Sequence, residues 1–232
     1  MGEKWDFSMP LEEAITTQRA LRRLKPDPVD EALVLRLIEL ALKAPTGSNA
    51  QNWEFIVVRD SAVKARLARR NRQAWRLYGG LGRWLTRNDA KMKRVLDAVQ
   101  WQADSFEEIP VIVVACLRGF RPWFPPIATA SYYGSVFPSV QNLLLAARAV
   151  NLGAALITLP LWSTWSARRI LGCPWSVQPC AVIPLGWPRG RYGPTTRRPV
   201  GDVVSLDRYG NRPWKGASPA PGQSSERRDG DE

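Results

Sequence analysis

The chain has 232 residues, of which 45% are hydrophobic, so it can bury a sizeable core and is not disordered as a whole. It carries a formal net charge of +12 and no histidine, which excludes histidine-based triads, histidine metal sites and the usual proton shuttle at neutral pH. The charge favours an anionic partner, and any chemistry must come from a bound cofactor, carboxylates, or Ser, Thr, Tyr and Arg side chains.

Three cysteines, Cys116, Cys173 and Cys180, stand in apolar surroundings. They indicate buried thiols in a reducing compartment and are too scattered to form a zinc cluster, so we expect no metal site. No stretch approaches the roughly 20 apolar residues that span a bilayer, and the charged N-terminus lacks a secretory core. We therefore expect a cytoplasmic protein with no membrane partner.

The N-terminal half begins with an arm at residues 1–10. Pro10 opens a helix expected over residues 10–24, and "KPDPV" ends it. Asp30 caps a second helix that stops before Pro45. Residues 53–60 form a strand that runs into Ser61, a suitable cap for a third helix, and residues 64–105 have helical propensity.

The C-terminal half is expected to alternate strands with helices. The expected elements, in chain order, are a buried strand at 110–117, a long helix at 127–153 bent at Pro138 and closed by Gly153, a strand at 154–160, a helix at 165–172 stopped by Gly172, a strand at 180–188, and an extended segment at 195–214. This alternation predicts a central sheet covered on both faces, but no strand is followed by the GxGxxG of a Rossmann site.

Arginines gather at the end of the first expected helix. Arg19 lies three residues before Arg22 and four before Arg23, so a helix would place both on the same face as Arg19. Two guanidinium groups on one face suit a phosphate, although a solvated basic face gives the same pattern. A second pair, Arg197 and Arg198, follows the last core strand.

The stretch "APTGSNAQNW" at residues 44–53 is unusually rich in small and amide side chains for a connection between a helix and a strand. Gly47 permits close approach of the backbone to a flat ligand, and Thr46, Ser48, Asn49 and Gln51 offer hydrogen bonds. The alternative is an elaborate helix end and turn.

Taken together and in this order, these segments resemble the FMN-dependent nitroreductase family. The resemblance runs from about residue 12 to about residue 206. It is carried by "TTQRALRRLKPDPV", "LALKAPTGSNAQNWEFIVVRD", "NLLLAARAVNLGAALITLP" and "CAVIPLGWP" with the following "RRPV". The second segment is the most specific, because this family places such a loop beside its flavin.

The resemblance implies a set of cofactor contacts but no catalytic protein residue. The N-terminal arginines would hold the FMN phosphate and the N1–O2 edge of the ring, the 45–51 loop would reach FMN from the partner subunit, and residues 158–160 would pack near N5. The implied cofactor-binding residues are Arg19, Arg22, Arg23, Pro45, Thr46, Gly47, Asn49, Gln51, Asn71, Thr158, Leu159, Pro160, Arg197 and Arg198. The chain departs from the family at Gln18, where Arg is common, and at Ala20, where Ser is common.

The implied fold is α+β, with a mostly antiparallel central sheet flanked by helices in an intertwined homodimer. The partner would supply an edge strand, for which "GDVVSL" is a candidate because a strand-like segment beyond the core needs an edge to pair with. The expected organisation is an arm at 1–10, an FMN-binding domain at 11–214 with a variable helical cover at 64–105, and a disordered tail at 215–232.

The implied activity is NAD(P)H oxidation by a ping-pong mechanism, with hydride transfer through flavin N5 to nitroaromatics, quinones or similar electron-poor small molecules. Two alternatives stay open. One is a specialised flavin enzyme of the same fold, which consumes its flavin or uses a deazaflavin. The other is a protein that binds or stores FMN without turnover.

The region from Arg66 to Trp101 is basic, with Trp75, Tyr78 and Trp84 between the charges. It could be a gate that attracts phosphorylated or otherwise acidic substrates, or a solvated helical face with its aromatic side chains turned inward. Because no nucleic-acid-binding motif accompanies these charges, we expect no nucleic-acid partner.

Overall fold

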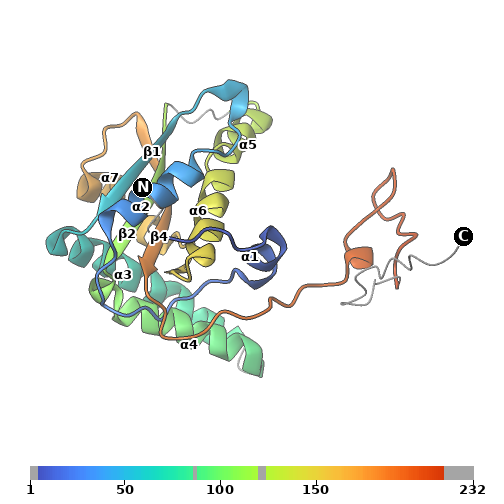
Figure 1. Cartoon of the computed structure of the whole chain (residues 1–232), viewed down its shortest axis with the longest axis horizontal. Coiled ribbons are helices and arrows are strands. Elements are labelled where there is room, and N and C mark those ends of the chain that lie inside the picture. The colour runs from blue at the N-terminus through green and yellow to red at the C-terminus, as the bar shows by residue number, and fades with distance from the viewer. Residues whose placement is uncertain (1–4, 86–87, 120–123, 217–232) are drawn as a thin grey trace, which may run out of the picture. The chain divides into compact units, whose positions relative to one another are not determined.

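The computed structural model describes residues 5–85, 88–119 and 124–216. These residues fall into two compact units, a first that ends at Pro194 and a second that begins at Thr195. Figure 1 shows a sheet flanked by helices in the first unit. Three parts of the sequence lie outside the described part: Arg87, the side chain of Trp84, and the tail from residue 217 onward.

The sheet of the first unit is antiparallel throughout, in the order β1-β2-β4-β3. Its strands are β1 (Trp53–Val58), β2 (Val111–Arg118), β3 (Gly153–Ala154) and β4 (Val177–Gly186). β2 and β4 are the central strands, and both are buried along almost their whole length, as their continuous apolar runs predict.

Helices cover both faces of the sheet. Since alternate residues of β2 point to opposite sides, its continuous apolar run presents apolar side chains to both layers of helices. Val111, Val113 and Ala115 pack with α2 (Glu31–Ala41) and α6 (Phe137–Ala149). Ile112 and Val114 pack on the other face with residues of α3 (Ser61–Leu85) and α7 (Thr164–Leu171). The remaining helices are α1 (Leu11–Thr17), α4 (Ala90–Asp104) and α5 (Pro126–Gly134), with short 3₁₀ turns at η1 (Gly47–Asn49), η2 (Phe106–Glu108), η3 (Leu159–Leu161) and η4 (Val200–Asp202).

Several element boundaries match those predicted from the sequence. Asp30 caps α2 by accepting a hydrogen bond from the Ala32 amide at 2.9 Å. Gly172 ends α7 in the left-handed conformation, with φ 68°. Most of the described part of residues 64–105 is helical, as expected, and it holds most of α3 and the whole of α4. Among the described residues, no helix combines the length and apolar character needed to cross a bilayer.

The first helix is shorter than predicted. It stops at Thr17, and Arg19, Arg22 and Arg23 lie in an irregular segment outside it. The amide of Leu21 donates to the Ala154 carbonyl of β3 at 3.1 Å, which draws the chain out of the helix. The prediction that these arginines share a helix face is therefore wrong.

The long helix predicted over 127–153 is two helices, α5 and α6, separated at Ser135 and Val136. Pro138 lies in the first turn of α6, where its missing amide costs no helical hydrogen bond, so it begins a helix and does not bend one. The chain turns after α6 at Asn151, with φ 57°, and Gly153 belongs to β3.

Three smaller predictions also need correction. Asp60, rather than Ser61, caps α3, because its carboxylate accepts the Val63 amide at 2.8 Å. The strand predicted over 154–160 is reduced to β3 and one bridge at Ile157, after which η3 begins. In the second unit η4 occupies residues 200–202, so the extended segment expected there is not continuous.

Candidate functional site

The predicted site residues fall in separate places along the fold. Four of these places belong to the first unit: the segment from Arg19 to Arg23, the loop at 45–51, Asn71 of α3, and the turn at 158–160. Arg197 and Arg198 are exposed residues of the second unit, where Arg197 donates to the Thr196 carbonyl at 3.0 Å.

The segment from Arg19 to Arg23 lies along the β3 edge of the sheet. Besides the bond from Leu21 to Ala154, Leu24 forms a bridge with Pro188, and the Arg189 amide donates to the Arg23 carbonyl at 2.9 Å. The segment is thus tied to the C-terminal end of β4.

Arg22 is the unusual member of this segment. Its side chain is half-buried, whereas Arg19 and Arg23 are exposed. Its Nε is fully buried and has no hydrogen-bond partner among the described residues. Burial lowers the pKa of Arg22 from its ordinary value, yet a guanidinium stays charged in proteins. A buried donor without an acceptor costs about 1–3 kcal/mol, so this position suits an anionic or hydrogen-bond-accepting ligand.

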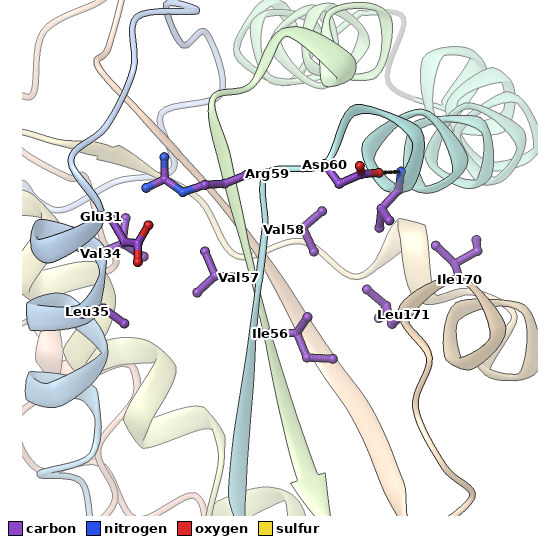
Figure 2. A pocket seen from close by; sticks show the side chains of 11 residues that line it. Glu31, Val34, Leu35, Ile56, Val57, Val58, Arg59, Asp60, Ile170 and Leu171 are labelled. Carbon is purple, nitrogen blue, oxygen red and sulfur yellow. Dashed lines mark hydrogen bonds between the residues drawn. The ribbon is translucent and has the colours of Figure 1, made fainter.

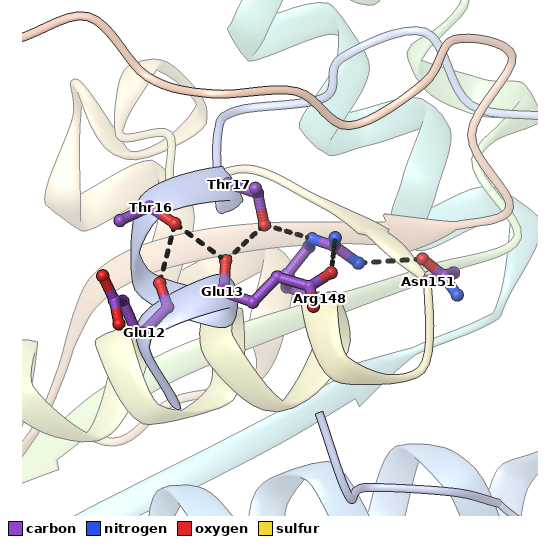
Figure 3. A network of polar contacts seen from close by, with 6 residues as sticks. All are labelled: Glu12, Glu13, Thr16, Thr17, Arg148 and Asn151. Carbon is purple, nitrogen blue, oxygen red and sulfur yellow. Dashed lines mark hydrogen bonds and ion pairs between the residues drawn. The ribbon is translucent and has the colours of Figure 1, made fainter. Parts of the chain in front are cut away.

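A buried arginine fixes the helix that leads into this segment. Arg148 of α6 is 6% exposed and donates three hydrogen bonds, to Thr17 at 2.7 Å, to Asn151 at 2.8 Å and to the Glu13 carboxylate at 3.2 Å. Its guanidinium also lies 4.6 Å from the ring centroid of Tyr192. Figure 3 shows the network joining α1 to the end of α6.

Sequence reasoning missed this network. The signal was available, since an arginine inside the apolar run "LLLAARAV" has to find partners when its helix is buried. The identity of those partners depends on how α1 folds back, which the local sequence does not reveal.

The loop at 45–51 lies at the other end of the sheet, before β1. Gly47 donates its amide to Ser135 Oγ at 3.2 Å, and a Cβ added to Gly47 would come within 3.2 Å of Ser131 Oγ. Gln51 donates its amide to Thr46 Oγ1 and its side-chain nitrogen to Asn49 Oδ1, both at 3.2 Å. The loop is therefore ordered by its own hydrogen bonds and by α5.

The backbone of this loop is also strained. Ser48, Asn49 and Gln51 all have positive φ, between 46° and 52°, a region that residues other than glycine rarely occupy. Strain of this kind is found where a surrounding structure or a ligand requires a particular shape. All three residues are exposed, so their polar groups are available to another molecule.

The turn at 158–160 borders a hollow of about 340 Å³. Thr158 is exposed and Leu159 half-buried, and both line the hollow, while Pro160 is buried. The rest of the lining combines aromatic and small apolar side chains, namely Tyr78, Tyr133, Leu161, Trp162, Pro179 and Cys180. Such a lining suits a flat apolar ligand with few polar groups. Asn71 is buried in α3, the helix that packs against η3.

A further groove follows the free edge of β1 and has a volume of about 430 Å³. Figure 2 shows Ile56, Val57 and Val58 of β1 between Leu35 of α2 and Leu171 of α7. An exposed sheet edge bordered by apolar side chains is a surface on which another strand can pair.

Comparison with known proteins defines the class. An iodotyrosine deiodinase crystallised with FMN and 3-iodo-L-tyrosine has the same fold, with a TM-score of 0.64 and 22% identity over 86% of this chain and 98% of that one. The sequence model of the nitroreductase family matches residues 15–187. The chain belongs to the nitroreductase family, and the expected α+β class with an antiparallel sheet is confirmed.

Curated relatives cover most of the chain. An NADH dehydrogenase of Thermus thermophilus is 27% identical over 215 residues, which are 86% of this chain and 98% of that protein. Iodotyrosine deiodinase 1 of Rattus norvegicus is 25% identical over 201 residues, 84% of this chain and 68% of that protein. Relatives of the same family thus carry different named activities.

Proposed function

We propose that this protein is an FMN-dependent oxidoreductase that takes electrons from NAD(P)H and reduces nitroaromatics, quinones or similar electron-poor small molecules. The observation that carries this proposal is Arg22, a half-buried cation whose Nε has no partner within the described residues. Membership of the nitroreductase family supports FMN as the cofactor, and Arg22 offers a hydrogen-bond donor that suits its anionic groups.

Bound FMN would supply the redox chemistry, accepting hydride from a nicotinamide cofactor and passing electrons to the second substrate. The chain's own residues need only bind, orient and exclude water. Arg19, Arg22 and Arg23 would hold the phosphate or the N1–O2 edge of the ring, where a fixed positive charge stabilises negative charge. Thr158 and Leu159 would flank the ring in the hollow at η3, above buried Pro160.

The remaining site residues follow from the same proposal. Asn71 would contact the ring from α3, and Arg197 and Arg198 would contact the phosphate. Pro45, Thr46, Gly47, Asn49 and Gln51 would reach the flavin of a second copy. No catalytic side chain is required, which agrees with a chain that has no histidine.

A homodimer accounts for two features of the single chain. The strained loop at 45–51 and the Arg22 segment lie at opposite ends of β4, whose ten residues span about 30 Å. One chain therefore carries the loop and the Arg22 segment too far apart to form one site. In a dimer, the loop of the partner would lie beside the Arg22 segment of this chain. The groove along β1 would receive the partner's "GDVVSL" segment, which would have to extend beyond η4 to pair there.

We also propose a cytoplasmic location, because all three cysteines are free and two of them are buried.

Purification tests the proposal directly. The protein should be yellow, release FMN on heating and oxidise NAD(P)H faster when a nitroaromatic or quinone is added. Bound FMN that NAD(P)H does not reduce would contradict the proposed electron donor, and would favour a storage protein or a flavin enzyme that uses another donor, such as a deazaflavin. Colourless protein that cannot be reconstituted with FMN would contradict the proposal. A panel including 3-iodotyrosine is needed, since one relative is named a deiodinase.

A further inference from the structure

Four arginines line one hollow between α3 and α7. Arg66, Arg69 and Arg70 come from α3 and Arg169 from α7, and the hollow has a volume of about 360 Å³. Positions 66, 69 and 70 recur at helical spacing, so the three side chains leave α3 on one face. Arg66, Arg69 and Arg169 are exposed, and Arg70 is half-buried.

The charge of this hollow is not neutralised. Within residues 5–85, 88–119 and 124–216, no ion pair involves any of these four arginines. The lining contains no carboxylate, and its other polar members are Gln73 and Ser166. Four like charges in one small hollow repel each other, so a bound anion would relieve that repulsion.

Parts of the hollow are held in place before any ligand arrives. Arg70 donates to Ser166 Oγ and, at 3.0 Å, to Gln73 Oε1. The guanidinium of Arg169 stacks on Trp165, 4.7 Å from the ring centroid. Trp165 and Ser166 belong to the first turn of α7, where helix amides and the helix dipole also favour an anion.

The hollow adjoins the segment proposed to flank the flavin ring. Arg70 lies 5.9 Å from the ring centroid of Trp162, and Trp162 lines the neighbouring hollow with Thr158 and Leu159. η3 and α7 are consecutive, so one short stretch of chain contributes to both hollows. A ligand that is flat at one end and phosphorylated at the other could occupy both.

We propose that the hollow between α3 and α7 binds the diphosphate group of a nucleotide, and that this nucleotide is the nicotinamide dinucleotide electron donor. The assignment of the donor rests on the proposed function. Guanidinium pairs recognise phosphate oxygens in bidentate fashion, and a hollow of this size accepts a small anion rather than a duplex.

A basic hollow nearby provides the matched control. Arg72, Arg76 and Arg83 line a hollow between α3 and α4 that also contains the carboxylate of Asp104. Arg76 and Arg83 are exposed and lie on the same helix as Arg66 and Arg69, so the double variant R76Q/R83Q also removes two positive charges, from a different place.

The experiment is a calorimetric titration of the full chain, saturated with FMN, with inorganic pyrophosphate, ADP and adenosine. Pyrophosphate and ADP should bind and adenosine should not. The double variant R66Q/R69Q should weaken pyrophosphate binding at least about tenfold, because each substitution removes a charge-assisted hydrogen bond to the ligand. The control variant R76Q/R83Q should change pyrophosphate binding less than about twofold. Thermal melting confirms that each variant is folded.

Kinetics then tests the donor. In R66Q/R69Q the KM for NADPH should rise about tenfold while kcat and FMN affinity stay unchanged, since the flavin contacts are intact. An unchanged KM in an active variant would overturn the donor assignment. The site would be overturned if R76Q/R83Q weakened pyrophosphate binding as much as R66Q/R69Q does. It would also be overturned if R66Q/R69Q left pyrophosphate binding unchanged, or if a DNA duplex bound more tightly than pyrophosphate. Because the titration needs no turnover, an inactive chain that binds pyrophosphate through these arginines would contradict the proposed function alone.

Discussion

The two ends of β4 differ in how the chain prepares them for a ligand. At its C-terminal end, Arg22 is half-buried in a segment tied to β3 and supported by the Arg148 network. Near its N-terminal end, the loop at 45–51 is exposed and strained but ordered by its own hydrogen bonds. One end offers a guanidinium whose Nε has no hydrogen-bond partner within the described residues, and the other offers amides and hydroxyls that carry no charge.

Under the proposed function, neither end would be a complete cofactor site. A phosphate needs the cation, and the edge of a heterocycle needs donors and acceptors such as those of Asn49. Since both ends are well ordered within one chain, their separation is built into the fold. A second copy of the chain is the simplest way to bring the two kinds of group together.

The largest effect should follow from removing Arg148. Arg148→Met keeps an unbranched aliphatic stem but loses the guanidinium and its three hydrogen bonds, so the free energy of unfolding should fall by about 2–3 kcal/mol. FMN should also bind more weakly, because α1 no longer fixes the Arg22 segment. Chemical denaturation and fluorescence titration measure the two changes.

Glu13→Gln is the control for this variant. Glu13 is half-exposed, so neutralising it should cost less than about 1 kcal/mol. A loss in Glu13→Gln as large as that in Arg148→Met would show that the ion pair, and not the whole network, anchors α1.

Arg22→Gln should weaken FMN binding by about 10- to 100-fold, the effect of losing a charge-assisted hydrogen bond. The free energy of unfolding should not fall, because the buried Nε has no partner within the described residues to lose. Equilibrium dialysis and denaturation measure both quantities. Arg94→Gln, at an exposed position of α4, is the control. Equal FMN affinity in Arg22→Gln and the wild type would contradict the assigned role.

Ser135→Ala sharpens the account of the other end. It removes the hydrogen bond from the Gly47 amide, so this amide should exchange with solvent about tenfold faster, while global stability falls by about 1 kcal/mol or less. Hydrogen exchange measures the change. Unaltered exchange at Gly47 would show that the hydrogen bonds inside the loop suffice to order it.

Tyr192→Phe should have the smallest effect, and it should depend on pH. Burial raises the pKa of Tyr192 to about 12 from an unfolded value of 10, and its hydroxyl donates to the Leu152 carbonyl at 2.8 Å. The hydroxyl therefore stabilises the fold fully below pH 10, and this contribution is lost as the pH rises from 10 towards 12. The stability difference between wild type and variant should be about 1 kcal/mol at pH 8 and shrink above pH 10. A constant difference would contradict the pKa shift.

The elements predicted well are those whose signal is local. The apolar runs of β2 and β4, the Asp30 cap of α2 and the Gly172 stop of α7 all specify their structure within a few residues. The central sheet with helices on both faces followed from the alternation of these segments, whereas its antiparallel arrangement followed only from the family resemblance.

The errors arose where distant residues decide the local structure. α1 ends early because Leu21 hydrogen-bonds Ala154, more than a hundred residues away in sequence. Gly153 was interpreted as a helix stop, but a Cβ there would approach Leu24 Cδ2 to 2.6 Å, so glycine is required for packing. The sequence marked Gly153 as special without showing which neighbour makes it so.

The candidate site was predicted in part for the same reason. The loop at 45–51 could be predicted from its composition, and the arginines at 19–23 from their charge. The Arg148 network and the hollow formed with Arg169 depend on how α1 and α7 pack against other helices, which composition does not encode. The sequence spacing of one chain does not indicate that the loop and Arg22 serve the same site. That assignment came from the family resemblance.

The most direct test of the central claim is complementation between two damaged subunits. Arg22→Gln and Asn49→Ala should each bind FMN poorly as homodimers. When the two variants are co-expressed, half of the dimers should be hybrids. Each hybrid should contain one intact site, with an unaltered Arg22 from one subunit and an unaltered Asn49 from the other, and one site in which both residues are altered. The account predicts that the mixture recovers about a quarter of the wild-type FMN content. FMN content no higher than the mean of the two parent variants would show that both residues serve the site from the same chain, or that they do not share a site.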